Sequence, residues 1–393
     1  MSSPHILIIG SGLGGLTLAQ ALKKNGVPFT VFERDASATA RAQGYRFRLH
    51  EGSEALQWCL PADMFGLFER TCGNTELGIT MIDPITATVT KEMDGADPSQ
   101  KNRPGGTNGP VGKAYTVDRT MFRSLLLLGL ESDVQFSKRF THYTTSDAGV
   151  TAHFSDSTTA SGTFLVGAEG VHSPVRKQFL PDHKHVDTGG RFVYGKTLLT
   201  PELRARFPAA GMSRMTLITD NTPMTLFQEP VVFAHDASVE SHGLLHPVKD
   251  YMYWVLLSRP ETFGLPDSQL VGLTGQPAAD LTLKVTQHWD PAIRSMLELQ
   301  SVEQTCAMRI ASVKPDLPAW TPSAQVAVLG DAVHAMSPTG AQGANVAIKD
   351  AASLAKVIVA GVTAEGVGPV RGGDEGGGEA GDRRELFRRQ AHV

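Results

Sequence analysis

Three glycines near the start of the chain have the spacing of a phosphate-binding turn. Gly10, Gly12 and Gly15 form the pattern GxGxxG within "GSGLGG". In such a turn the first glycine permits a sharp bend, the second lets a pyrophosphate approach the backbone, and the third lets a helix pack closely on a strand. The N-terminus of the following helix then presents free N–H groups and a positive dipole end to the phosphates.

The residues around this turn predict the elements that it requires. We expect a strand over residues 5–9, a helix over 13–24 and a second strand over 29–32. This crossover makes the two strands parallel. Glu33 ends the second strand, where its carboxylate can accept hydrogen bonds from both ribose hydroxyls of an adenosine. A dinucleotide is therefore predicted, although this pattern alone does not separate NAD from FAD.

A segment near the other end of the chain favours FAD. In "VAVLGDAVHAMSPTGAQGAN" we predict a strand over residues 324–330, a turn, and a helix from about Gly343 to Ala360. Asp331 can bind a hydroxyl group of a sugar or polyol, and the helix N-terminus can stabilise negative charge. A flavin offers both partners, because its ribityl chain carries hydroxyls and its pyrimidine edge becomes anionic on reduction.

A third polar turn follows an apolar segment in "LVGAEGVHSPVR", residues 165–176. Ser173 and Pro174 are expected to start a helix as its N-cap and first residue, which are the positions that these residue types favour. The acid of the turn is Glu169.

The three segments together resemble the fingerprints of the single-component FAD-dependent aromatic hydroxylases. A further stretch, "LHEGSEAL", is similar to the tetracycline-inactivating members of that group, and the resemblance extends to about residue 360. It implies extended FAD, and NADPH or NADH as a donor that binds without a second Rossmann fold. It also implies a flavin C4a-hydroperoxide that hydroxylates or epoxidises a small aromatic or apolar molecule with O2.

The resemblance also assigns roles to individual residues. Those expected to bind the cofactor are Gly10, Gly12, Gly15, Glu33, Arg34, Arg41, Arg119, Asp331, Gly343, Ala344 and Asn345. Pro338 is expected beside the oxygen-reacting face of the flavin, and no residue is assigned as a catalytic acid, base or nucleophile. Members of the group usually carry Asp where this chain has Glu169. The extra methylene moves the carboxylate by about 1.5 Å, and we expect FAD still to bind.

The predicted fold class is α/β, a Rossmann-type FAD-binding domain with an inserted, mostly antiparallel substrate sheet. The FAD-binding domain is expected over residues 1–75, 113–185 and 281–360, and the substrate domain over 76–112 and 186–280. Residues 361–393 are glycine-rich and are expected to form a flexible tail. Helices are predicted from about Tyr115 onward and over 283–299. Of Arg46 and Arg48, we expect at most one to face the substrate pocket.

Composition narrows the possible partners. The net charge is -4 and no long basic run occurs, so a nucleic acid is not expected. Cys59, Cys72 and Cys306 are widely spaced, which indicates neither a disulfide framework nor a metal site. The apolar runs are too short to span a bilayer, so a cytoplasmic protein is expected. We expect it to be a monomer or a homodimer. A halogenase or reductase of the same fold, or a flavin-binding protein without turnover, remain alternatives.

Overall fold

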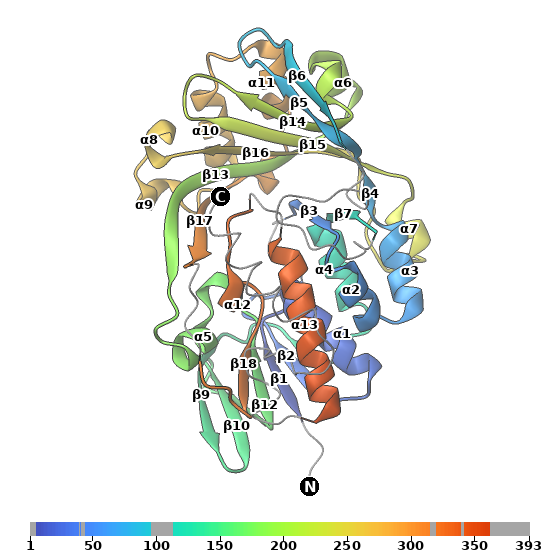
Figure 1. Cartoon of the computed structure of the whole chain (residues 1–393), viewed down its shortest axis with the longest axis vertical. Helices are drawn as coiled ribbons and strands as arrows, with labels where there is room; N and C mark the ends of the chain where they lie inside the picture. The colour runs from blue at the N-terminus through green and yellow to red at the C-terminus, as the bar shows by residue number, and fades with distance from the viewer. Residues whose placement is uncertain are drawn as a thin grey trace, which may run out of the picture.

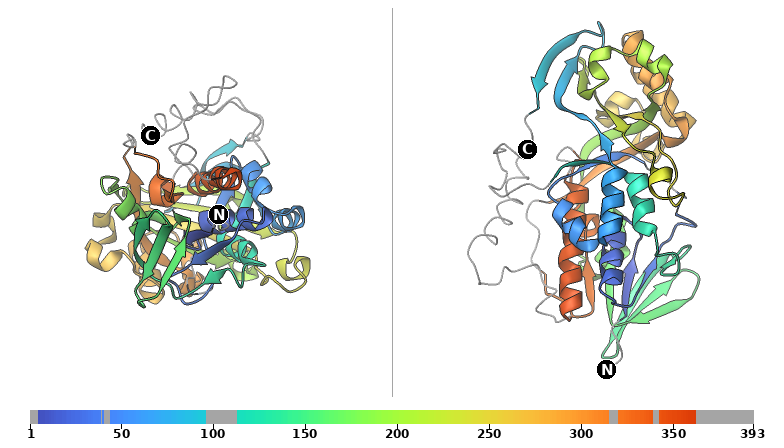
Figure 2. Two further views of the ribbon diagram at one scale, coloured as in Figure 1. Left: turned by 90° about the horizontal axis from the view of Figure 1, so that it is seen from below. Right: turned by 90° about the vertical axis from the view of Figure 1, so that its right-hand side faces the viewer.

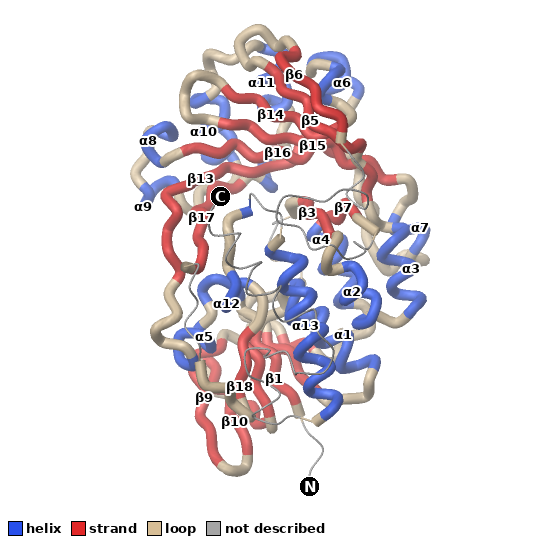
Figure 3. Tube along the Cα trace, in the orientation of Figure 1, coloured by secondary structure: helices blue, strands red, loops and turns tan. Residues whose placement is uncertain are grey.

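The computed structural model describes residues 5–38, 40, 44–95, 113–314, 320–338 and 342–361. Arg41, one of the predicted cofactor residues, and the glycine-rich segment 362–393 lie outside the described residues. Two large β-sheets organise the rest of the chain, one above the other (Figure 1). Figure 3 separates strand from helix and shows that each sheet carries its own set of covering elements.

The lower sheet is parallel and five-stranded, in the order β18-β12-β1-β2-β8. Its strands are β1 (Ile6–Ile9), β2 (Phe29–Phe32), β8 (Val134–Gln135), β12 (Phe164–Gly167) and β18 (Val326–Val328). Helices α1 (Leu13–Lys24) and α13 (Gly343–Ala360) pack on one face. The opposite face packs against a small antiparallel sheet of β9 (Phe140–Ser146), β10 (Gly149–Phe154) and β11 (Thr159–Gly162), as the right-hand view of Figure 2 shows. The predicted Rossmann unit is thereby confirmed.

The upper sheet has ten strands and is mostly antiparallel, as predicted. Its main path runs through β17 (Cys306–Val313), β13 (His185–Leu198), β16 (Tyr251–Ser258), β15 (Thr225–Phe233), β14 (Arg214–Thr219), β5 (Glu76–Ile82) and β6 (Val89–Asp94). A short ribbon of β3 (Arg46–Leu49), β4 (Gly73–Asn74) and β7 (Tyr115–Asp118) branches from β15. Strand β13 is long enough to descend from the upper sheet toward the lower one (Figure 1).

The two faces of the upper sheet have different neighbours because side chains alternate along a strand. One face places Val193, Trp254 and Leu256 in an apolar core. That core includes residues of α6 (Pro201–Arg206), α8 (Pro260–Phe263), α9 (Asp267–Leu270), α10 (Gln276–Val285) and α11 (Pro291–Glu298). The opposite face is turned toward the lower sheet.

The remaining helices have nine residues or fewer. They are α2 (Ser53–Cys59), α3 (Ala62–Arg70), α4 (Arg119–Leu127), α5 (Pro174–Phe179), α7 (Ala237–Glu240) and α12 (Asp331–His334), with 3-10 turns at Gly170–His172, Ala209–Gly211 and Val302–Gln304. No helix in the described ranges is both long and apolar enough to cross a membrane.

Two predicted helices differ from the structure for local reasons. The segment from Tyr115 starts as strand β7, and the helix begins only at Arg119, because Asp118 accepts a hydrogen bond from the Met121 N–H and caps it. The helix predicted over 283–299 is two helices. Asp290 accepts a hydrogen bond from the Ala292 N–H and is followed by Pro291, a combination that starts a new helix rather than continuing the old one.

The predicted domain boundary at residue 281 falls inside α10. Helices α10 and α11 contribute to the core under the upper sheet, and β17 pairs with β13 of that sheet. Residues 281–313 therefore lie with the upper sheet, although the sequence division assigned them to the FAD-binding domain. The division itself stays a prediction.

Packing of α1 on the lower sheet depends on Gly15. A Cβ atom there would lie 2.2 Å from the carbonyl oxygen of Gly10, which is backbone and cannot move aside. We predict that Gly15→Ala lowers the free energy of unfolding by about 3 kcal/mol in urea denaturation. Gly66→Ala is the control, since its Cβ would meet only the flexible end of Arg70 and should stabilise α3 by about 1 kcal/mol. Equal stability of the Gly15→Ala variant and the unaltered protein would contradict this packing.

Candidate functional site

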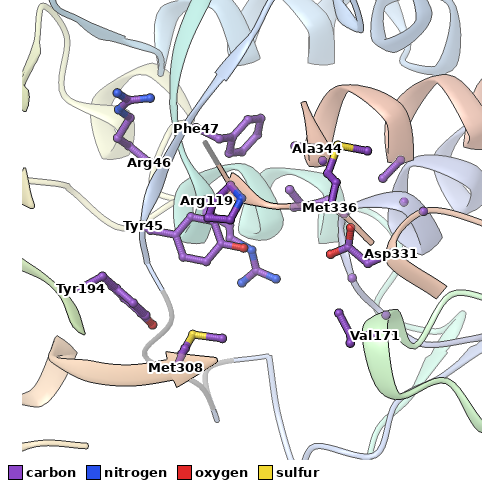
Figure 4. Close-up of a pocket in the computed structure, with 18 of the residues that line it drawn as sticks. Tyr45, Arg46, Phe47, Arg119, Val171, Tyr194, Met308, Asp331, Met336 and Ala344 are labelled. Atoms are coloured by element: carbon purple, nitrogen blue, oxygen red, sulfur yellow. The ribbon is translucent and has the colours of Figure 1, made fainter. Parts of the chain in front are cut away.

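A cavity of about 1570 Å³ runs between the two sheets. It extends from the glycine turn after β1, past the N-terminus of α13, to the inner face of the upper sheet. Figure 4 shows residues of its walls, with Arg119 and Tyr45 on one side and Asp331 and Met336 on the other. The cavity therefore joins the predicted cofactor residues to the part of the chain predicted to contact substrate.

The glycine turn is shaped for a close approach from the cavity. Gly10 has φ +106°, and a Cβ there would lie 2.6 Å from the Ala168 carbonyl oxygen. At Gly12 the nearest atom beyond its chain neighbours would lie 3.7 Å from an added Cβ. The cavity wall is therefore bare backbone at this position, because glycine has no side chain. Gly12 is also the N-cap of α1 and provides no side-chain cap. Gly10 and Gly12 line the cavity, whereas Gly15 packs behind them.

Glu33 lies at the end of β2, as predicted, and is almost fully buried. Its carboxylate accepts hydrogen bonds from the backbone N–H and the hydroxyl of Ser11, both at 2.9 Å, and from the Asp35 N–H at 3.0 Å. Burial opposes ionisation, but these hydrogen bonds outweigh it and lower the pKa of Glu33. Arg34 lines the cavity next to it. Sequence reasoning missed Arg123, whose Nη2 donates to the Ser11 hydroxyl at 2.7 Å.

The N-terminus of α13 faces the cavity through Gly343 and Ala344. Its N-cap, Gln342, provides no side-chain hydrogen bond to the first turn. Asn345, predicted to contact the cofactor, is fully buried and does not line the cavity. Its Oδ1 accepts from the backbone N–H groups of His50 and Gly52, at 3.0 and 3.1 Å. In the structure its side chain thus ties the start of α13 to the end of β3.

Asp331, Arg119 and Pro338 all line the cavity. The Asp331 residue is exposed to the cavity, yet the protein atoms around it remove enough water to raise the pKa of its carboxyl, and the Arg119 charge opposes that rise. The guanidinium of Arg119 lies over the Tyr45 ring, 5.1 Å from its centre. A positive charge and an acid thus face one space, as Figure 4 shows.

Glu169 caps the helix that follows its turn. Its Oε2 accepts from the Ser173 hydroxyl at 2.6 Å, and its Oε1 accepts from the Val175 N–H at 3.2 Å. Ser173 in turn accepts from the Arg176 N–H, and Pro174 is the first helical residue, so the predicted helix start is confirmed. The long Glu side chain reaches both donors from within the turn. Burial raises the pKa of Glu169 to about 7.

The inner face of the upper sheet is the large apolar wall of the cavity. Sequence reasoning located it only as strands without naming its residues. The period-2 alternation of these strands is the signal that selects one face, but it does not say which face is covered by helices. The lining side chains are Phe192, Tyr194, Met215, Leu217, Phe227, Tyr253, Val255, Leu257, Met308 and Ile310.

Both Arg46 and Arg48 line the cavity, so the prediction that at most one would face it is wrong. Residues two apart on a strand share a face. Phe47 and Leu49 point into the core of the lower sheet, which turns the two arginines toward the upper sheet. There both form ion pairs with Glu229, a residue that sequence reasoning did not single out.

Two further observations concern metal ligands and thiols in the described part of the chain. No group of three or more His, Cys, Asp or Glu side chains there could hold a metal ion. Cys59, Cys72 and Cys306 are free thiols whose pKa values are raised by burial.

Comparisons with known proteins agree with this geometry. Residues 8–62 match the family model of an NAD(P)-binding Rossmann-like domain, and residues 300–368 match that of an FAD-binding domain. A putative FAD-containing monooxygenase from Photorhabdus luminescens has a similar structure, with a TM-score of 0.73 and 27% identity over 99% of this chain and 95% of that one. HpxO from Klebsiella pneumoniae, solved with FAD and uric acid, shares the fold with a TM-score of 0.67 at 20% identity, over 93% and 82% of the two chains.

Two curated relatives come from fungi. A dual O-methyltransferase/FAD-dependent monooxygenase of Phaeosphaeria nodorum is 40% identical over 90% of this chain but only 40% of its own length. An FAD-dependent monooxygenase of Trichoderma harzianum is 29% identical over 90% of this chain and 82% of its own length. The chain thus spans about two fifths of the length of the dual-function relatives it matches.

The fold and the cavity define a flavoprotein built on one Rossmann domain. Together with these matches, they show that the chain is similar to FAD-dependent monooxygenases, the group that its motifs resemble. The prediction of FAD as cofactor is confirmed, and the Rossmann-like match agrees with a nicotinamide co-substrate.

Glu169 provides a pH-dependent test of the turn. Because its pKa is about 7 in the folded protein and near 4.5 when unfolded, folding favours the neutral acid, and stability falls as pH rises from 4.5 to 7. Glu169→Gln removes this loss. We predict that the FAD-free variant is more stable than the unaltered protein by about 2 kcal/mol at pH 8 and similar to it at about pH 4.5, measured by urea denaturation.

The control is Glu303→Gln, the same change at an exposed carboxylate away from the turn. An identical difference at both pH values for Glu169→Gln would show that this carboxyl does not titrate as described.

Proposed function

We propose that this chain is an NAD(P)H-dependent FAD monooxygenase that hydroxylates or epoxidises a small aromatic or polycyclic molecule. The observation that carries the proposal is the single cavity described above. One end has an open glycine turn and the other an apolar, aromatic sheet face, with the uncapped N-terminus of α13 between them. The pyrophosphate, the flavin ring and the substrate would thus occupy neighbouring parts of one cavity.

The residues present fit FAD. A Cβ at Gly12 would project into the cavity. It would keep a pyrophosphate from approaching the backbone closely, so the absence of a side chain at Gly12 fits this cofactor. Glu33 and Arg34 would hold the adenosine ribose end. Asp331 would bind ribityl hydroxyls, and the N–H groups at Gly343 and Ala344 would face the pyrimidine edge. Arg119 and Pro338 line the part of the cavity that would hold the ring system.

FAD, when bound and reduced by NADPH or NADH, would supply an oxygen atom taken from O2. The chain's own residues have three tasks. Backbone N–H groups at the start of α13 stabilise negative charge. The apolar wall of Phe227, Tyr253 and Met308 excludes water. The same wall holds an aromatic substrate flat and within reach, and in this proposal no side chain acts as a nucleophile.

The remaining predictions on partners belong to the same proposal. O2 and a small aromatic or apolar molecule would be the reactants, and the protein would be a monomer or homodimer. A cytoplasmic location is supported by the three free thiols, since reducing compartments keep cysteines in that form.

The experiment is reconstitution with FAD, followed by measurement of NADPH and NADH oxidation with a diverse panel of aromatic compounds, and mass spectrometry of the products. A product heavier by one oxygen atom, labelled from ¹⁸O2, is expected. A yellow protein that shows no substrate-stimulated oxidation across the panel would favour a flavin-binding protein without turnover. A product carrying halide would favour the halogenase alternative, and protein that binds no FAD would refute the proposal.

Gly12 separates cofactor binding from folding. Because the nearest atom beyond its chain neighbours would lie 3.7 Å from its would-be Cβ, Gly12→Ala should still fold, with only a small loss of stability at the start of α1. We predict that its affinity for FAD, measured by titration of the FAD-free protein, falls by about tenfold or more, a loss of at least about 1.4 kcal/mol. Gly66→Ala is the matched control and should bind FAD normally. Unchanged FAD affinity in Gly12→Ala would place the pyrophosphate elsewhere.

A further inference from the structure

Met308 lies on a strand of the upper sheet that is joined to the proposed flavin site. It belongs to β17, and the backbone N–H of Val313 at the end of that strand donates to the Ala335 carbonyl at 2.8 Å. Ala335 comes three residues before Pro338, so this hydrogen bond ties β17 to the cavity wall where the ring system would lie. The side chain of Met308 is half-buried and lines the same cavity.

Four methionines within the described ranges line the cavity, namely Met93, Met215, Met308 and Met336. A thioether is a soft nucleophile, and a single oxygen atom converts it into a polar and chiral sulfoxide. Met93 and Met215 lie on β6 and β14, toward the opposite edge of the upper sheet from β17. Met308 is therefore better placed than these two to receive oxygen at the flavin end of the wall.

Tyr194 is a cross-strand neighbour of Met308. In the register of β13 and β17, Phe192 lies opposite Met308 and Tyr194 lies opposite Cys306. Tyr194 and Met308 are thus diagonal neighbours on one face of the sheet, within reach of each other's long side chains. Both line the cavity, and Figure 4 shows the hydroxyl end of Tyr194 turned toward Met308.

The hydroxyl of Tyr194 is buried and has no hydrogen-bond partner among the described residues. The whole residue is only 2% exposed, and its ring packs edge-on against Tyr45, with 5.7 Å between the ring centres. Burial raises the pKa of Tyr194, so the hydroxyl keeps its proton at neutral pH. A buried donor without an acceptor is destabilising, and thioether sulfur is only a weak acceptor. A sulfoxide oxygen on Met308 would be a strong one.

We propose that Met308 is a site of self-oxygenation, where sulfur accepts an oxygen atom when no substrate fills the cavity and Tyr194 donates a hydrogen bond to the new S–O group. This inference rests on the proposed function, because FAD, O2 and NADPH supply the oxygen. One atom of O2 bonds to the sulfur, which gives up two electrons. NADPH and a proton supply two more electrons and two hydrogens, and the second oxygen atom leaves as water. The products are methionine sulfoxide, NADP⁺ and water.

Proximity and polarity both favour this reaction at Met308. A sulfur held beside the place of oxygen transfer competes as an intramolecular reactant, with a high effective concentration. The S–O bond is strongly polar, so its oxygen gathers negative charge as it forms, and the Tyr194 O–H gains the acceptor that it lacks. An aromatic substrate lying on the same wall would separate Met308 from the oxygen. The sulfoxide would leave a polar group on an apolar wall until a reductase reverses it.

The test incubates the FAD-reconstituted protein with NADPH and ¹⁸O2, without an aromatic compound and with catalase to remove free peroxide. Mass spectrometry then locates the label, and fragmentation of the tryptic peptide 295–309 separates Met308 from the fully buried Met296. Met64 and Met212 are half-buried like Met308 but do not line the cavity, so they report oxidation by peroxide in solution. We expect Met308 to gain one ¹⁸O atom about tenfold or more faster than either control.

Stereochemistry and two variants make the test specific. Oxygen delivered from one side gives one sulfoxide epimer, which only one of the two epimer-specific reductases reduces, whereas free H2O2 gives both epimers. Tyr194→Phe should lower the label in Met308 per NADPH consumed by about fivefold, the effect of one hydrogen bond. It removes an unpartnered buried hydroxyl, so its stability in urea should not fall. Tyr253→Phe is the control and should leave that ratio unchanged, since it alters the same wall two strands away from β17.

The outcomes separate this inference from the proposed function. Equal label in Met308 and the two control methionines, both epimers at Met308, or label in Met336 alone would contradict the inference, as would an unchanged ratio in Tyr194→Phe. Steady NADPH oxidation without label in Met308 would overturn the inference and leave the proposed function standing. If NADPH does not reduce the bound FAD, light and EDTA reduce it instead, and ¹⁸O2 still tests Met308. Protein that binds no FAD would overturn both proposals.

Discussion

The arrangement of the site depends on two strands of the short ribbon, β3 and β7, which lie between the lower sheet and the rest of the upper sheet. Strands β3 and β7 place apolar side chains such as Phe47 and Val117 in the core of the lower sheet. Their opposite sides carry Arg46 and Asp118, which pair with Glu229 and Lys196 of the upper sheet. Removing one member of a buried ion pair costs about 3–5 kcal/mol, because it leaves an uncompensated charge. These pairs tie β3 and β7 to the upper sheet beside the cavity.

This constraint explains why the site is assembled from distant parts of the chain. The glycine turn, the turn at Glu169 and the N-terminus of α13 all follow strands β1, β12 and β18 of one parallel sheet, at the edge where ligands bind in such folds. The upper sheet supplies a wall with one apolar face toward the cavity and the other toward α10 and α11. Each motif spans only a few consecutive residues, but the cavity is formed between the two sheets and is lined by residues of both.

The local motifs could be predicted from the sequence, whereas the contacts between residues far apart in the chain could not. The glycine turn, the helix bounds of α1 and α13, and the Ser173 cap follow from residue preferences within a few positions. By contrast, Glu229 on β15 contacts Arg48 on β3, about 180 residues away in the sequence. No pattern in the residues near Glu229 predicts this contact. Asn345 shows the same limit, since its position at a helix start suggested a ligand contact while its partners are backbone groups of residues 48–52.

A structure of the protein crystallised with FAD tests the central claim most directly, namely that one cavity holds an extended cofactor beneath the aromatic face of the upper sheet. We predict density for the pyrophosphate within hydrogen-bond distance of the backbone after Gly12. The flavin ring should lie beside Arg119 and Pro338, with its ribityl chain at Asp331, its pyrimidine edge at Gly343 and one face open toward Phe227. A flavin bound outside this space, or a pyrophosphate away from the glycine turn, would contradict the account.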